Sequence, residues 1–176
     1  MWISLIGFMG SGKSTVGRRT AERAFASCID FDAEIAAEAG RSIAEIFARD
    51  GEAEFRALER RALEAVDRDG DGVLACGGGI VEAWSNRELL RSLGVVVWLD
   101  ASWETLRARL ESDGGERPLV GDLGWDGLEE LYLRRRPLYA ATAHFRLRAD
   151  LDDVEETARR VAACRSAARP RKEASP

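Results

Sequence analysis

The chain has 176 residues, a length that fits a single domain of about 100–200 residues. Apolar residues make up 45% and charged residues 32%, and 31 acidic against 26 basic side chains give a net charge of −5, which argues against a general nucleic-acid binder. No uncharged run approaches the ~18 residues of a membrane-spanning helix, and the apolar start Met1–Gly10 lacks the basic residues of a secretory signal.

Short apolar runs alternate with longer helical stretches, which predicts a parallel α/β sheet. Strands are expected over Trp2–Gly7, Cys28–Asp30, Gly72–Ala75, Val95–Leu99 and Phe145–Arg148. Helices are expected over Lys13–Phe25, Ile43–Val66 (interrupted near Gly51), Asn86–Ser92, Trp103–Glu111, Trp125–Ala143 (divided at Pro137) and Asp152–Cys164. We expect one domain over residues 1–164, a mobile loop over 112–124 and a disordered tail over 165–176.

The segment Gly7–Ser14 (GFMGSGKS) matches the pattern G-x-x-x-x-G-K-[ST] between a predicted strand and a predicted helix. Its glycines let backbone N–H groups surround a phosphate, and the helix N-terminus adds a positive dipole end. Lys13 can reach the β- and γ-phosphates, the Ser14 hydroxyl can bind Mg²⁺, and Thr15 can contact the α-phosphate. The motif predicts binding of a nucleoside triphosphate, but GTPases, ATPases and small-molecule kinases share it.

Two carboxylates, Asp30 and Asp32, end the second predicted strand, where a parallel sheet borders its ligand crevice. In an extended chain their side chains face the same way. One could hold Mg²⁺ through water, and the other could accept a proton or hydrogen bond from an attacking hydroxyl. Alternatively, Asp32 only caps a helix that begins near Ala33.

Three arginines stand in suggestive surroundings: Arg56 on a predicted helix, Arg117 in the loop before Pro118, and Arg135 in an Arg-Arg-Arg-Pro segment. Guanidinium groups bind carboxylates and phosphates at two points. The alternative for each arginine is a solvated surface charge. The triple glycine Gly77–Gly79 would let a ligand contact backbone, or it forms a tight turn.

Together these segments resemble the shikimate kinase family of the nucleoside-monophosphate-kinase-like P-loop fold. The resemblance runs from Trp2 to about Val161. It rests on the blocks GFMGSGKST, Asp30-Phe-Asp32, GRSIAEIFARDGEAEFRALE (40–59), Gly77–Gly79, Arg117-Pro-Leu119 and Arg135-Arg-Pro-Leu-Tyr139. The long block and the triple glycine are specific to the family, whereas the phosphate-binding loop is generic.

The resemblance implies a three-layer α/β/α P-loop fold with a five-stranded parallel sheet, helices on both faces and a mobile lid over about 112–124. It implies a substrate-binding helical segment over about 31–61. It implies an enzyme that transfers a phosphoryl group from ATP to the shikimate 3-hydroxyl, giving 3-phosphoshikimate and ADP on the route to chorismate and aromatic amino acids.

The resemblance also implies a role for individual residues. ATP would be bound by Gly10, Ser11, Gly12, Lys13, Ser14, Thr15 and Arg117, and Mg²⁺ by Ser14 and, through water, Asp30. Shikimate would be bound by Asp32, Arg56, Gly78 and Arg135. The catalytic residues would be Lys13, Asp32 as candidate base, and Arg117 in the lid over the phosphates. An arginine of the family often stacks on adenine, and here Arg107 and Arg109 compete for that role.

Two other functions are weighed against this one. A related small-molecule kinase, such as a gluconate kinase, would share the phosphate-binding loop without needing Arg56 and Arg135 over a ring acid. A non-catalytic nucleotide-binding protein would share the fold without the activity.

Three widely spaced cysteines (Cys28, Cys76 and Cys164) form no metal or disulfide pattern, which favours a reducing cytoplasm. We also expect a monomer with no nucleic-acid or membrane partner.

Overall fold

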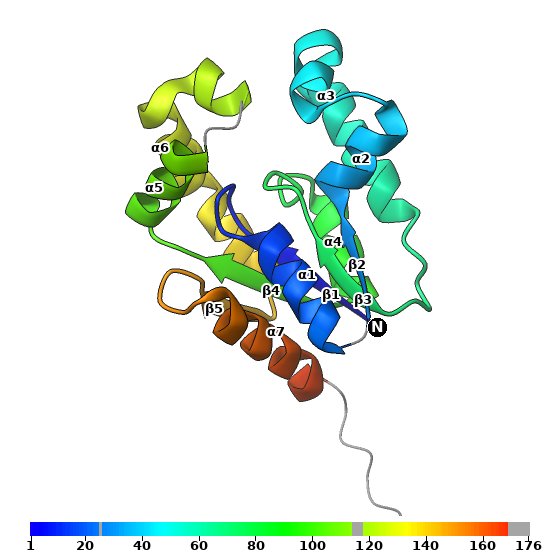
Figure 1. Cartoon of the computed structure of the whole chain (residues 1–176). Coiled ribbons are helices and arrows are strands. Elements are labelled where there is room, and N and C mark those ends of the chain that lie inside the picture. Colours follow the sequence, from blue (N-terminus) through cyan, green and yellow to red (C-terminus); the bar gives the residue numbers. More distant parts are fainter. Residues whose placement is uncertain (25, 114–117, 169–176) are drawn as a thin grey trace, which may run out of the picture.

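A computed structural model describes residues 1–24, 26–113 and 118–168 of the chain (Figure 1). These residues form five parallel strands in the order β2-β3-β1-β4-β5, together with seven helices. The strands are β1 (Trp2–Ile6), β2 (Ser27–Asp30), β3 (Gly72–Ala75), β4 (Gly94–Asp100) and β5 (Phe145–Arg148). The helices are α1 (Lys13–Ala24), α2 (Phe31–Ala39), α3 (Ile43–Glu64), α4 (Trp84–Leu93), α5 (Trp103–Asp113), α6 (Pro118–Thr142) and α7 (Val154–Ala168).

The predicted three-layer α/β/α architecture with a five-stranded parallel sheet is confirmed. Helices α1 and α7 cover one face, where Val16 and Val161 pack against alternate strand residues such as Leu5 and Val97. Helices α3, α4 and α6 lie toward the other face, where the strand residues Ile6, Leu74 and Trp98 join a second apolar core. Strand β1 is buried along its whole length, as expected for a central strand with helices on both sides.

The strand order places three chemically important loops at one edge of the sheet. β1 lies between β3 and β4, so the loops that follow β1 and β3 leave neighbouring strand ends. The end of β2 lies one strand farther along, next to β3. Ligands of open parallel sheets bind beyond the carboxyl ends of the strands, where the connections diverge. The phosphate-binding loop, the Asp30 region and the triple glycine therefore meet on one side of the molecule.

Most predicted element ends lie within two residues of the observed ones, but α2, α6 and the end of α7 differ. Helix α2 begins at Phe31, so Asp32 lies inside its first turn and the alternative that Asp32 only caps a helix from Ala33 is wrong. The prediction of an extended chain over Asp30–Asp32, with both carboxylates facing the same way, is wrong for the same reason. Helix α6 is interrupted at Gly124 (φ 63°, ψ 179°) and not at Pro137, which lies inside the helix. Glycine adopts such a positive φ at little cost.

The predicted loop 112–124 and the predicted tail also need correction. Residues 112–113 end α5 and residues 118–123 belong to α6, so these parts are helical. Residues 114–117, which include Arg117, lie outside the described residues. The predicted start of the disordered tail, residue 165, is too early, because helix α7 continues to Ala168. Residues 169–176 lie outside the described residues.

The interruption predicted within the long helix is confirmed at Gly51, where φ is 81° and ψ is 172°. The helix begins with a reciprocal cap, since the Ser42 hydroxyl accepts from the Glu45 N–H and the Glu45 carboxylate accepts from the Ser42 N–H. This capping box satisfies N-terminal backbone donors. No helix in the described ranges is both long and apolar enough to cross a bilayer.

Candidate active site

A cavity of about 420 Å³ lies at the edge of the sheet where the three loops meet. Its walls come from the loop after β1, the start of α1, the ends of β2 and β3, α5 and the segment before α7. Every predicted nucleotide or metal residue in the described ranges lines it, together with Asp32 and Gly78: Gly10, Ser11, Gly12, Lys13, Ser14, Thr15, Asp30, Asp32 and Gly78. The fold thus brings these residues together around one space.

The phosphate-binding loop has the conformation that its glycines permit. Gly10 and Gly12 have φ values of 78° and 89°, which residues with a side chain rarely adopt. Lys13 Nζ lies 2.9 Å from the carbonyl oxygens of Gly7 and Phe8, to which it donates hydrogen bonds. The buried Ser11 hydroxyl makes no hydrogen bond within the described part of the chain. The loop is therefore shaped before any phosphate is bound.

Each glycine of the Gly77–Gly79 segment faces a functional group. A Cβ atom at Gly77 would collide with the Glu59 carboxylate, and one at Gly79 would collide with the Arg56 guanidinium. A Cβ atom at Gly78 would lie 3.9 Å from Arg135 Nη1. A tight turn alone does not explain these glycines, because side chains at positions 77 and 79 would displace the Glu59 carboxylate and the Arg56 guanidinium.

Arg56 and Arg135 do not line the 420 Å³ cavity; they face the triple glycine that borders it. Arg135 is 1% exposed, and its Nε donates a 3.0 Å hydrogen bond to Glu82. Arg56 Nη1 forms an ion pair with Glu59. Two arginines from α3 and α6, far apart in sequence, therefore lie beside the Gly77–Gly79 segment.

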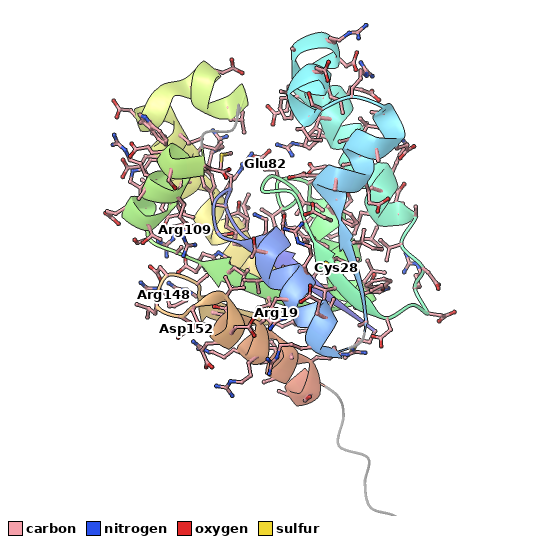
Figure 2. All side chains as sticks on the ribbon, in the orientation of Figure 1. Arg19, Cys28, Glu82, Arg109, Arg148 and Asp152 are labelled. Carbon is pink, nitrogen blue, oxygen red and sulfur yellow. The ribbon has the colours of Figure 1, made fainter. Side chains whose placement is uncertain are left out.

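Glu59 and Glu82 are site residues that the sequence reasoning missed. Glu59 is completely buried, and burial raises the pKa of its carboxyl group while the nearby Arg56 opposes that shift. Its spacing of three residues from Arg56 on one helix was a usable signal. Glu82 lies between β3 and α4, where no motif pointed to it; Figure 2 labels it between the side formed by α3 and the side formed by α6.

Of the two candidate adenine-binding arginines, Arg109 lines the cavity and Arg107 does not. Arg109 lines it and donates to the carbonyl oxygens of Gly10 (3.3 Å) and Ala149 (2.9 Å). Arg107 instead pairs with Glu111 and lies over the ring of Trp125. Asp152 and Val154 complete this end of the cavity, and Figure 2 labels Arg109 and Asp152 on the same side of the molecule.

The amino-acid sequence also matches a known family. The family model for shikimate kinase matches residues 9–165. The chain belongs to the shikimate kinase family. A shikimate kinase of Symbiobacterium thermophilum is 45% identical over 161 residues, which cover 89% of this chain and 91% of that protein. A shikimate kinase of Salinibacter ruber is 42% identical over 170 residues, covering 92% and 82%.

Solved structures place the fold in the same family. The shikimate kinase of Acinetobacter baumannii in complex with shikimate superposes with a TM-score of 0.85 at 35% identity, over 91% of this chain and 89% of that one. A gluconokinase from Sinorhizobium meliloti reaches only 0.59 at 18% identity, over 94% and 91%. The gluconokinase likeness shows a shared P-loop kinase fold alone, and the gluconate kinase alternative is not favoured.

Proposed function

We propose that this protein transfers the γ-phosphoryl group of ATP to the 3-hydroxyl of shikimate, giving 3-phosphoshikimate and ADP for aromatic amino acid biosynthesis. The observation that carries the proposal is the placement of Arg56 and Arg135 beside the triple glycine, next to a phosphate-binding loop and two carboxylates. Shikimate has one carboxylate and three hydroxyls. Its carboxylate suits the two guanidiniums, and its hydroxyls suit Asp32.

The nucleotide would bind along the 420 Å³ cavity, with its phosphates in the loop Gly10–Thr15 and its base near Arg109. The Ser14 hydroxyl and the Asp30 carboxylate both line this space, and they supply the hard oxygen ligands that Mg²⁺ takes together with phosphates and water. When bound, Mg²⁺ would neutralise charge on the β- and γ-phosphates. Lys13 would turn from the Gly7 and Phe8 carbonyls to the phosphates.

The acceptor would lie where Asp32 and Gly78 border the cavity. Asp32, in the first turn of α2, would accept a hydrogen bond or a proton from the attacking hydroxyl. Arg117 would lie over the transferred phosphoryl group from a lid over about residues 112–124, and the chain as far as the end of α7 would act as one catalytic domain. Phosphoryl transfer needs chiefly positioning and charge neutralisation, which these side chains supply.

A coupled assay of ADP release with ATP and Mg²⁺ tests the proposal, with shikimate and gluconate offered side by side. We expect ADP release that depends on shikimate and a kcat/KM for shikimate far above that for gluconate. Tight ATP binding without shikimate-dependent ADP release would contradict the proposal, as would a preference for gluconate.

We also propose that the protein acts in the cytoplasm as a monomer without a nucleic-acid or membrane partner. The net charge of −5 disfavours binding to polyanions, and the three cysteines are free thiols, which suits a reducing compartment. Sedimentation equilibrium across a range of concentrations tests the oligomeric state, and a mass of twice 19.4 kDa would overturn the monomer.

A further inference from the structure

The Glu82 carboxylate lies against both arginines assigned to the acceptor. Its Oε1 accepts a 3.0 Å hydrogen bond from Arg135 Nε, and its Oε2 lies 3.9 Å from Arg56 Nε. Arg56 comes from α3 and Arg135 from α6, so one acidic side chain joins these two helices, and Figure 2 labels Glu82 between the side of the molecule formed by α3 and the side formed by α6. A bound substrate carboxylate would need the same two guanidinium groups.

The charges around these arginines are already compensated without a substrate. Arg56 pairs with Glu52 at 2.9 Å and with the buried Glu59, in addition to its contact with Glu82. Arg135 is buried, and a buried guanidinium is costly unless it is paired. Glu82 supplies that pairing. An incoming carboxylate adds a fourth negative charge to a group of two arginines and three carboxylates.

Glu82 contacts Arg135 as well as Arg56, whereas the more exposed Glu52 pairs with Arg56, and Glu82 is better able to give way than Glu59. Glu59 is fully buried and cannot turn to water, whereas the Glu82 side chain is 31% exposed. Arg134 Nη2 lies 3.9 Å from Glu82 Oε1, and the Arg134 side chain is 72% exposed. Arg56 and Glu82 also border a cavity of about 380 Å³, which leaves room for a side-chain rotation. Glu82 can therefore exchange its pairing with the buried Arg135 for a pairing with the exposed Arg134.

We propose that Glu82 occupies guanidinium surface that receives the substrate carboxylate, and that it sets the apparent affinity for the acid substrate by competing with it. This inference rests on the proposed function, because it takes the acceptor to be a carboxylate held by Arg56 and Arg135. Glu82 acts here as a specificity-determining residue. Glu82 favours substrates whose carboxylate pairs with Arg56 and Arg135 strongly enough to displace the Glu82 carboxylate.

The test is the steady-state kinetics of Glu82→Gln, which removes the charge and keeps the shape. We expect the KM for shikimate to fall about two- to fivefold, the range for one partly exposed ion pair, with kcat and the KM for ATP unchanged. Glu88→Gln is the matched control, because Glu88 is an exposed carboxylate on α4. Glu88→Gln should leave all three constants unchanged.

A second readout separates competition from a structural effect. The methyl ester of shikimate, which lacks the negative charge, should inhibit the wild type and Glu82→Gln with equal inhibition constants. Melting temperatures identify a folding defect, and Glu82→Ser repeats the test if the glutamine variant unfolds. An unchanged or raised KM for shikimate in a folded Glu82 variant would overturn the inference. Failure of the proposed function would look different, since the wild type itself would not phosphorylate shikimate.

Discussion

The Tyr139 hydroxyl donates a 2.5 Å hydrogen bond to the carbonyl oxygen of Gly78 and thereby joins α6 to the loop after β3. Tyr139 is buried, and its ring stacks on Trp98 with centroids 5.9 Å apart. Burial raises the pKa of its hydroxyl, which therefore stays protonated as a donor at all physiological pH values. Arg135 lies one turn earlier on α6, so this bond fixes the distance between Arg135 and the triple glycine.

Tyr139→Phe removes that bond and keeps the aromatic packing. We expect a loss of about 1 kcal/mol in the free energy of unfolding, because a carbonyl loses its donor, and a raised KM for shikimate with little change in the KM for ATP. Tyr132→Phe is the control, since Tyr132 donates a comparable 3.0 Å bond to Ala101, away from the triple glycine. Equal effects of both variants on the KM for shikimate would refute a positioning role for Tyr139.

Replacing Lys13 with alanine should reduce kcat by about 10²–10³-fold, the usual effect of removing one donor that stabilises transition-state charge. The fold should survive, because Lys13 donates hydrogen bonds to two loop carbonyls and is not part of the apolar core. Turnover and thermal melting are measured together. Arg18→Ala, at an exposed position of the same helix, should leave both unchanged. Collapse of the melting transition in Lys13→Ala would show that Lys13 is a structural residue.

Arg56→Ala should raise the KM for shikimate by at least about tenfold, because charge-assisted hydrogen bonds are lost. It should also cost about 3 kcal/mol of stability, because Glu59 would be left buried without its partner. The double variant Arg56→Met with Glu59→Gln should recover stability but not the KM. Arg60→Ala, which breaks the exposed pair with Glu64, is the control. Recovery of the KM in the double variant would show that Arg56 acts only through the fold.

Arg109→Ala should raise the KM for ATP about three- to tenfold, as expected when a guanidinium no longer packs on an aromatic base, without changing the KM for shikimate. The comparison variant is Arg107→Ala, since Arg107 faces Trp125 and not the cavity. Isothermal titration of ATP and ADP gives the same comparison without catalysis. If Arg107→Ala weakened nucleotide binding more than Arg109→Ala, the location of the base subsite would be wrong.

The stability of the segment before α7 should depend on pH through Asp150. Hydrogen bonds from Arg148 lower the pKa of Asp150 to about 2, against about 3.9 for an unfolded aspartate. A lowered folded-state pKa stabilises the fold above pH 4, and this contribution is lost as the pH falls through 2. Asp150→Asn should therefore cost about 2 kcal/mol in urea unfolding at pH 7 and almost nothing near pH 2. Asp126→Asn, at an exposed position, should show no such difference.

Local sequence signals predicted the elements that depend on local physics. The strand Gly72–Ala75 has the predicted bounds, because an apolar run between turn residues fixes both ends. The strand Phe145–Arg148 also has the predicted bounds, and in it apolar and basic residues alternate. The break at Gly51 was predictable since only glycine readily takes its positive φ. Pro137 misled the prediction, because a proline removes one helical hydrogen bond and packing can keep the helix intact, whereas Gly124 supplied the conformation that breaks α6.

The sequence by itself determined the phosphate-binding loop, since a glycine pattern between a strand and a helix specifies its own backbone shape. It also supplied Asp30, Asp32, Arg56 and Arg135 as separate candidates. Only the tertiary structure decided that these residues meet, that Arg109 rather than Arg107 faces the cavity, and that Glu82 bridges the two arginines. The reason is that ion pairs between distant segments depend on sheet order and helix packing, which leave no periodic pattern in the chain.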